Sequence, residues 1–253
     1  MNIFISVVSH DHKKIIEEMS CLPGLAKNFK VVLKSNKEDG LDNYCNSNEI
    51  YHINKQFGRG FGENNNIIFQ YCIKELNMND DDFFIILNPD CHVSVNAIES
   101  ITKQMQEHNH KLVTINLFKD FELETPDNTL RKYPSFLNFI MSFLGLSSSS
   151  VVCKKEITEI INVDWAHGAF LAFNARHYKR LSGFDERYFM YCEDADICLR
   201  SSLLKEPLFY YPSIHGVHLK QESSKRIFSK FFLYHVQSVL IFIFRKNFVN
   251  RIK

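Results

Sequence analysis

DDFFIILNPD, residues 81–90, is the stretch that decides how this chain is expected to fold. Its five consecutive apolar residues, 83–87, are typical of a strand that is buried on both faces of a sheet. Pro89 has no backbone N–H to give to a neighbouring strand, so the strand is expected to end there. Asp90 then lies just beyond the carboxyl end of a buried strand, where α/β proteins bind their ligands.

Further strands are expected at residues 3–8, 29–33, 50–53 and 111–115. Helical patterns separate most of them. One helical pattern follows a glycine-rich stretch that begins at Gly58, and it runs to Leu76. Ser94 is a good N-terminal cap for another helix, which runs to about His108. This alternation predicts an α/β protein with a doubly wound, mostly parallel sheet flanked by helices.

The organisation of the chain changes in two places. Residues 118–161 lose the alternating rhythm and are interpreted as an irregular excursion. The C-terminal end is strongly basic, because residues 220–253 carry eight Lys or Arg and one Glu, a net charge of +7 that leaves −6 for the rest. We expect one domain over residues 1–221 and a basic appendage over residues 222–253. Such a tail indicates an anionic surface as partner, or simply a solvated helix.

The bulk composition excludes several classes of protein. The net charge of the 253 residues is +1, so the chain lacks the overall basic field of most nucleic-acid binders. Its seven cysteines include no C-x-x-C pair, which argues against a disulfide framework and favours a reducing cytosol. No apolar run reaches the ~18 residues of a membrane-spanning helix, and the N-terminus does not read as a signal peptide.

The densest chemical signal is GFDERYFMYCEDADICLR, residues 183–200. Clustered acids are costly to hold together unless a cation or a reaction needs them. If residues 192–204 are helical, Glu193 and Asp196 share a face and Asp196 can pair with Arg200. Asp194 then points elsewhere, which makes it a candidate general base. The alternative is that these acids only stabilise the first turn of a helix.

Three other features could carry chemistry. In GRGFGENN, residues 58–65, glycines allow close approach of a ligand and the following helix start favours phosphate, although the spacing is not that of a dinucleotide fingerprint. Asp90 could bind a divalent cation or belong to a plain turn. His218 and His215 could complete a coordination sphere or bind a diphosphate, or could be ordinary surface histidines.

In this order along the chain, several motifs together resemble one family. They are VVSHDH (7–12), GFGENNN (60–66), LNPD (87–90), WAHGAF (165–170), the acidic block at 183–200 and H-x-x-x-x-S (218–223). The set is similar to the family 2 glycosyltransferases, in particular to bacterial rhamnosyltransferases that act on N-acetylglucosaminyl-diphospho-undecaprenol in O-antigen synthesis. The resemblance extends over residues 3–246 and implies a GT-A fold.

The resemblance also implies roles for individual residues. Asp194 matches the catalytic base and Glu193 the acid beside it, while Asp90 and His218 match ligands of Mg²⁺ or Mn²⁺, with His215 as the fallback. Asn36 stands near where relatives carry an Asp that holds the nucleotide base. The expected donor side comprises Ser9, Asn36, Gly60, Gly62, Asn64, Asn65 and Asn88, and the expected acceptor side comprises Trp165, His167 and Gly168.

The function implied is an inverting, metal-dependent transfer of L-rhamnose from dTDP-rhamnose to a lipid-linked N-acetylglucosamine. Alternatives are a UDP-hexose donor, a non-catalytic nucleotide-sugar-binding domain, and a membrane scaffold, which leaves the acidic block unexplained. A lipid-linked acceptor places the enzyme on the cytoplasmic face of the bacterial inner membrane. Residues 228–244, followed by Arg245 and Lys246, read as an amphipathic helix on an anionic membrane, or as a helix packed on the domain or in a dimer.

Overall fold

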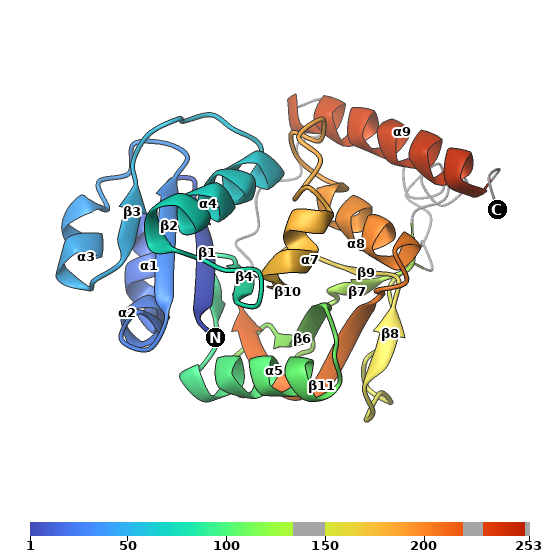
Figure 1. Cartoon of the computed structure of the whole chain (residues 1–253), viewed down its shortest axis with the longest axis horizontal. Helices are drawn as coiled ribbons and strands as arrows, with labels where there is room; N and C mark the ends of the chain where they lie inside the picture. The colour runs from blue at the N-terminus through green and yellow to red at the C-terminus, as the bar shows by residue number, and fades with distance from the viewer. Residues whose placement is uncertain (134–149, 220–229, 251–253) are drawn as a thin grey trace.

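The computed structural model describes residues 1–133, 150–219 and 230–250, and a twisted sheet runs through its centre (Figure 1). The strand order is β3-β2-β1-β4-β10-β6-β11-β5, with β8 on the far side of β11. The strands are β1 (Ile3–Ser9), β2 (Lys30–Ser35), β3 (Tyr51–Ile53), β4 (Phe83–Leu87), β5 (Cys91–His92), β6 (Leu112–Phe118), β8 (Ile161–Val163), β10 (Phe170–Asn174) and β11 (Leu208–His218).

Most of these strands run in one direction. The pairs β3/β2, β2/β1, β1/β4 and β6/β11 are parallel. Strand β10 lies antiparallel between β4 and β6, and β5 and β8 are antiparallel to β11. The predicted mostly parallel sheet is therefore confirmed, with β10 as an antiparallel insertion. The carboxyl ends of β1, β2 and β4 meet at one edge of the sheet.

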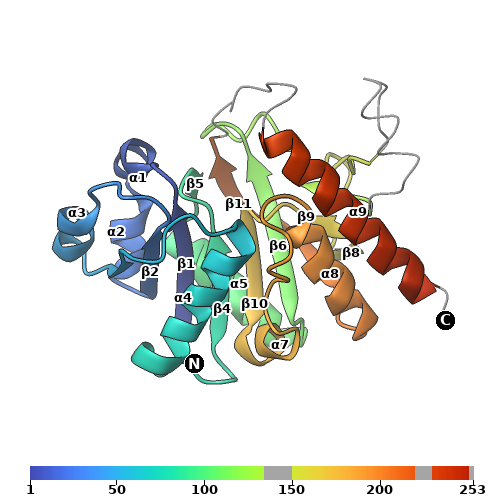
Figure 2. The ribbon, with the colours of Figure 1, turned by 90° about the horizontal axis from the view of Figure 1, so that it is seen from above.

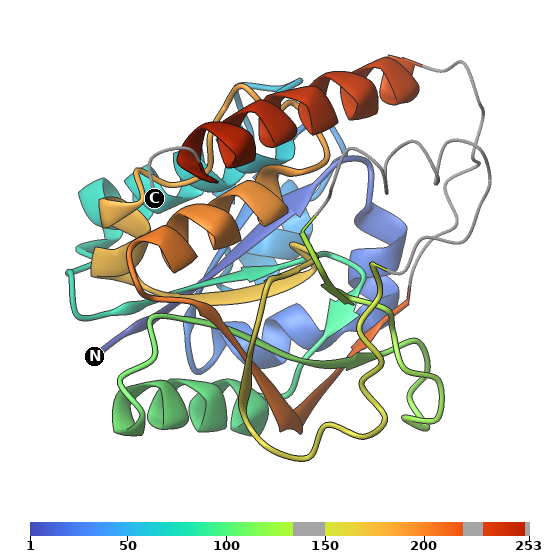
Figure 3. The ribbon, with the colours of Figure 1, turned by 90° about the vertical axis from the view of Figure 1, so that its right-hand side faces the viewer.

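Helices cover both faces of the sheet because its strands are apolar on both faces. In β4, Phe83, Ile85 and Leu87 enter one core cluster, whereas Phe84 and Ile86 enter the other. The first cluster is closed by α1 (Lys13–Met19), α2 (Cys21–Ala26), α3 (Asp42–Ser47) and α5 (Val95–Glu107). The second is closed by α4 (Phe61–Leu76), α7 (Ala175–Arg180) and α8 (Glu193–Leu203), and Figure 3 shows the sheet between α8 and α5.

Local side-chain chemistry explains where several helices begin and end. Ser94 Oγ accepts a hydrogen bond from the Ala97 amide, so the predicted cap of α5 is confirmed. Asn174 accepts from His177 at the start of α7 in the same way. Helix α4 ends at Asn77, whose φ of 55° is left-handed, a conformation that Asn tolerates.

The C-terminal helix α9 (Lys230–Asn250) lies alongside α8 (Figure 2). Val239 and Phe242 share a buried cluster with residues 188–199, and Ser238 donates to the carbonyl of Met190. The expected helix is present, and one of its faces packs on the domain. The opposite face exposes 41% of Leu240 and 73% of Phe244. Within the described part of the chain, no helix has the length and apolarity needed to cross a membrane.

A short ribbon formed by β7 (Leu130–Arg131) and β9 (Trp165–Ala166) lies beside the main sheet. Strand β7 belongs to the region 118–161, which was expected to be irregular. Part of that region, residues 134–149, lies outside the described residues, as do the expected domain boundary at 221/222 and Ser223. The described part of the region is thus tied to the segment that carries Trp165, His167 and Gly168.

Candidate active site

Asp194 lies in the first turn of α8, directly after an abrupt change of chain direction. Tyr191 and Cys192 have φ values of 72° and 64°, which are uncommon for residues with side chains. The Asp194 carboxylate accepts hydrogen bonds from the amides of Ala195 at 2.8 Å and Gly168 at 3.2 Å. Burial raises the pKa of Asp194 to about 6, against the lowering effect of those two amides. Asp194 as a residue is only partly buried, so a substrate can approach it.

Glu193 has a different environment from its neighbour. It is only 6% exposed, and its Oε2 has no hydrogen-bond partner among the described residues. Burial, followed by the charge of Asp194, raises the pKa of Glu193 well above its usual value. Two neighbouring carboxyl groups in such different environments suit two different roles.

Asp196 anchors this end of α8. It is fully buried, and its Oδ2 accepts from Arg200 Nε at 2.7 Å, as the i, i+4 spacing predicted. Its Oδ1 accepts from Arg245 of α9 at 2.5 Å. Arg200 also donates to the carbonyl of Gly183. Asp196 is thus a structural residue that fixes the segment carrying Asp194.

A second group forms where β4 and β11 end. His218 Nδ1 lies 2.7 Å from Asp127 Oδ2, and its Nε2 lies 3.4 Å from Asp90 Oδ1. Burial lowers the pKa of His218, but the hydrogen bond to Asp127 and the negative charges of Asp127 and Asp90 outweigh it and raise the pKa to about 9. The sequence pattern missed Asp127, because it lies in the irregular region and reaches His218 across 91 positions.

This group fits a divalent cation. Asp90 Oδ1 is buried and has no hydrogen-bond partner among the described residues, so the 3.4 Å contact with His218 is electrostatic. Asp127 on Nδ1 leaves Nε2 directed towards Asp90, and such a carboxylate behind a histidine is common at metal sites. Cys91 Sγ also lies within the group, but burial raises the pKa of its thiol and oxygen is the preferred ligand of Mg²⁺. Asp90 and His218 are therefore the residues that would hold the ion.

On the expected donor side, the side-chain amide of Asn36 forms its hydrogen bonds with the protein backbone. Its side-chain amide accepts from the Arg59 N–H and donates to the Arg59 carbonyl, both at 2.8 Å. Ser9 and Ser35 instead donate to the two oxygens of Asp39 at 2.6 and 2.8 Å. The carboxylate at the ends of β1 and β2 is therefore that of Asp39, which the sequence reasoning missed because it lies in the loop beyond the strand.

The glycine-rich segment also differs from its expected arrangement. A Cβ added to Gly60 would lie 2.5 Å from the Phe189 carbonyl oxygen, and one added to Gly62 would lie 2.6 Å from Phe184 Cβ. In this structure residues 184–189 therefore fill the space beside Gly60 and Gly62, where a nucleotide was expected. Asn64 and Asn65 are fully buried, and they donate to the carbonyls of Gly60 and Phe61, respectively, within the same turn.

The expected acceptor-side residues lie together along β9 and the turn after it. Trp165 Nε1 donates to the carbonyl of Lys132, and its ring centroid lies 5.4 Å from that of His167. Gly168 must be small, because an added Cβ would lie 2.9 Å from Phe61. Asn88 is partly exposed, and its backbone N–H donates to Ala169. His215, the fallback metal ligand, is exposed and packs against Phe118.

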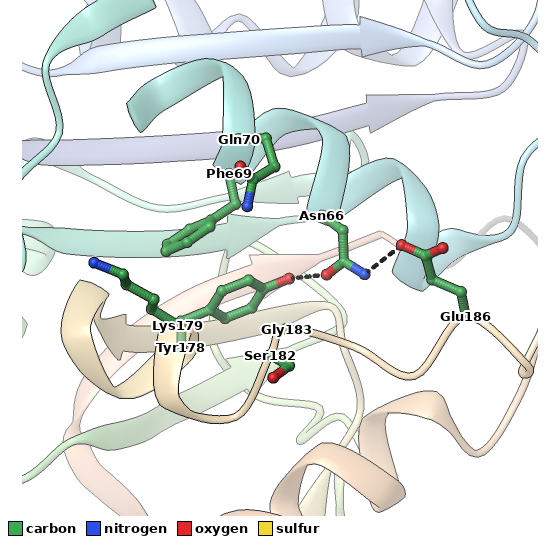
Figure 4. A pocket seen from close by; sticks show the side chains of 8 residues that line it. All are labelled: Asn66, Phe69, Gln70, Tyr178, Lys179, Ser182, Gly183 and Glu186. Carbon is green, nitrogen blue, oxygen red and sulfur yellow. Dashed lines mark hydrogen bonds between the residues drawn. The ribbon is translucent and has the colours of Figure 1, made fainter. Parts of the chain in front are cut away.

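A separate cleft between α4, α7 and the segment after α7 contains none of these residues (Figure 4). Asn66 accepts from the Tyr178 hydroxyl at 2.8 Å and donates to Glu186 at 2.9 Å. Both amide atoms of Asn66 are thus used within the protein. The cleft is a structural junction that holds the start of the 183–200 block against α4.

The fold places the chain in a known class. No protein-family model matches the sequence. Among solved structures, that of GalNAc-T7 with UDP, GalNAc and Mn²⁺ aligns with a TM-score of 0.60 and 13% identity, over 88% of this chain and 46% of that one. At that identity the likeness concerns the fold alone, which is the GT-A fold of glycosyltransferases.

Two relatives narrow the class. The rhamnosyltransferase WbbL of Escherichia coli K12 is 31% identical over a 263-residue alignment covering 98% of this chain and 95% of that protein. The N-acetylglucosaminyl-diphospho-decaprenol L-rhamnosyltransferase of Mycobacterium tuberculosis H37Rv is 26% identical over 174 residues, 64% of this chain and 55% of that protein. This chain spans about half the length of the mycobacterial enzyme. It belongs to the family of bacterial rhamnosyltransferases and is a glycosyltransferase.

Proposed function

We propose that the protein transfers L-rhamnose from dTDP-rhamnose to a lipid-linked N-acetylglucosamine, with inversion at the anomeric carbon. The observation that carries the proposal is the position of Asp194. Its carboxylate is held by two backbone amides, and burial raises its pKa to about 6, so at neutral pH it is charged and still basic enough to accept a proton.

In the proposed reaction, Asp194 takes the proton from the acceptor hydroxyl as that oxygen attacks the anomeric carbon and the bond to the diphosphate breaks. A positioned base contributes on the order of 10²–10⁴-fold in rate. Gly168 orients the base through its N–H, and the raised pKa of buried Glu193 disfavours a second negative charge beside it. A single displacement of this kind needs no covalent intermediate.

A divalent cation, Mg²⁺ or Mn²⁺, is part of the proposal. Asp90 and His218 would hold it, and Asp127 would orient the imidazole. When bound, the ion neutralises charge on the leaving diphosphate. Support comes from the buried, unpartnered oxygen of Asp90 and from the Mn²⁺ named in the GalNAc-T7 structure.

The choice of substrates rests on the relatives. One is named a rhamnosyltransferase, and the name of another includes a polyprenyl-linked N-acetylglucosamine, which supports the donor sugar and the acceptor class. A UDP-hexose donor is the alternative. The decisive assay supplies the purified protein with Mg²⁺, a synthetic N-acetylglucosaminyl-diphospho-lipid, and either dTDP-rhamnose or UDP-hexoses. Rhamnose transfer that EDTA abolishes is the expected result, and transfer only from a UDP-sugar would overturn the rhamnose assignment.

We further propose that the enzyme works on the cytoplasmic face of the inner membrane and contacts anionic lipid through α9. The outward face of the helix exposes Leu240 and Phe244, one turn apart, within a strongly basic segment. Flotation with anionic vesicles tests this. Replacing both Leu240 and Phe244 by serine should abolish flotation, whereas Phe57→Ser, at an exposed aromatic outside α9, should leave it unchanged. Equal flotation of the wild type and the double variant would remove the claim.

A further inference from the structure

Arg131 is a cation that the described protein leaves incompletely paired. It lies in β7, opposite Trp165 of β9, and is partly buried. Its Nη1 makes one long hydrogen bond of 3.4 Å to Ser150 Oγ, while its buried Nε has no partner among the described residues. Among the described residues, no carboxylate lies within ion-pair distance of Arg131. A guanidinium offers five N–H donors, so most of its capacity is unused.

The surroundings of Arg131 link the two halves of the candidate site. Burial lowers its pKa, and the charges of Asp127 and Asp194 act in the opposite direction. Asp127 holds His218 of the proposed metal site, and Asp194 is the proposed base. The pairing of β7 with β9 places Arg131 beside the segment that holds Asp194, because Arg131 lies opposite Trp165 and the N–H of nearby Gly168 donates to Asp194.

A partly desolvated cation without a close counter-ion is unfavourable in the free protein, so the site is suited to an anionic ligand. The planar fork of a guanidinium matches two oxygens of a phosphate group. Both substrates of the proposed reaction carry a diphosphate, one on the donor sugar and one on the lipid-linked acceptor. The chemistry that Arg131 can recognise is therefore common to both substrates.

We propose that Arg131 binds the diphosphate of a substrate beside the proposed base, an inference that rests on the proposed function. The donor diphosphate is the first source, because it is joined directly to the anomeric carbon that the acceptor oxygen attacks. Arg131 then donates hydrogen bonds to the diphosphate oxygens. These oxygens become more negative as the bond between the anomeric carbon and the diphosphate breaks. The charge of Arg131 stabilises the leaving group and favours the ionised form of Asp194.

The test compares the full-length wild type with Arg131→Met, which keeps the apolar stem, and with Arg131→Lys, which keeps the charge but not the fork. Calorimetry measures the binding of dTDP and of dTMP, and steady-state kinetics give KM for each substrate. For Arg131→Met we expect dTDP affinity to fall about 10- to 100-fold with little change for dTMP, because hydrogen bonds to charged groups are strong. Arg187→Met, at an exposed arginine, is the matched control and should bind dTDP like the wild type.

The outcomes separate the two sources and the two hypotheses. A raised KM for the donor together with weaker dTDP binding assigns Arg131 to the donor, and a raised KM for the lipid-linked acceptor alone assigns it to the acceptor. If neither KM nor dTDP affinity changes while transfer continues, the inference is wrong and the proposed function stands. If the wild type transfers no sugar, the proposed function itself fails. If the Met variant does not fold, the same measurements of dTDP affinity and KM are made on Arg131→Lys.

Discussion

Arg245 of α9 donates to Oδ1 of Asp196, which lies two residues after Asp194 in α8. The same arginine donates to Asp185 at 2.6 Å. Asp196 is fully buried and is also held by Arg200, so the C-terminal helix is joined by ionic contacts to the helix that carries the proposed base. Packing of α9 and the geometry of the candidate active site are therefore coupled.

Replacing Arg245 by Met should destabilise the protein, because it removes one partner from a buried carboxylate. We expect a loss of about 1–3 kcal/mol in the free energy of unfolding, less than for a fully buried pair because Arg245 is partly exposed. Urea denaturation measures the loss. Arg187→Met is the control, since Arg187 also pairs with Asp185 but is well exposed, and it should cost about 0–1 kcal/mol. Equal effects of both substitutions would contradict the coupling.

Asp194→Asn should abolish transfer and leave donor binding largely intact. The amide keeps the size of the side chain but cannot accept the acceptor proton, and a lost base costs on the order of 10²–10⁴-fold in rate. Single-turnover rates and dTDP-rhamnose affinity are the measurements. Asp81→Asn, at an exposed surface aspartate, should behave like the wild type. Wild-type turnover in the Asp194 variant would exclude Asp194 as the base.

The rate should rise with pH through about 6, the raised pKa of Asp194, because only the ionised carboxylate accepts a proton. Arg131 lowers that pKa through its charge. Arg131→Met should therefore move the midpoint of the pH–rate profile to higher pH. A profile flat between pH 5 and about 7 in the wild type would contradict the role of Asp194.

Gly60→Ala should destabilise the protein, because the new Cβ would lie 2.5 Å from the backbone oxygen of Phe189. Forcing apart two backbone segments costs about 1–3 kcal/mol. Gly24→Ala is the control: it lies in α2, a Cβ there meets nothing within 4 Å, and alanine favours helix. Thermal unfolding should therefore show a lower Tm for the first variant and an unchanged or higher Tm for the second.

Asp127→Asn should weaken Mn²⁺ binding, because Asp127 orients the imidazole of His218 and makes it more basic. Loss of such an outer carboxylate typically costs 10- to 100-fold in metal affinity, roughly the range expected here. Calorimetric titration with Mn²⁺ measures it without any substrate. His215→Ala is the control, since His215 is exposed and lies against Phe118. Unchanged affinity in the Asp127 variant would argue against the proposed metal site.

The regular elements were predictable because their signals are local. The apolar run of β4 defines a strand and so positions Asp90, and the i, i+4 spacing of Asp196 and Arg200 defines the first turns of α8. Asp127 and Arg131 were not predictable. They lie in a segment without periodicity. Asp127 reaches His218 across 91 positions and Arg131 lies opposite Trp165 of β9, so only the folded chain brings them to the site.

The glycine-rich segment shows a local signal that was interpreted only partly correctly. Glycine at residues 60 and 62 correctly indicated a close approach, but the sequence does not say what approaches. The structure places Phe184 and Phe189 there. Likewise, an apolar and basic C-terminal helix is equally compatible with a lipid surface and with α8, and α9 packs on α8 while still exposing Leu240 and Phe244.

The packing of α9 on α8 sets the distance between the helix that carries Asp194 and the exposed face of α9. Packed helices lie about 8–10 Å apart, so α8 is one such spacing from the axis of the helix that presents Leu240 and Phe244. In a chain resting on lipid through those two residues, Asp194 would stand at a constant height above the headgroups. The enzyme would then select acceptors by how far the sugar hydroxyl projects from the membrane, before any contact with the sugar itself.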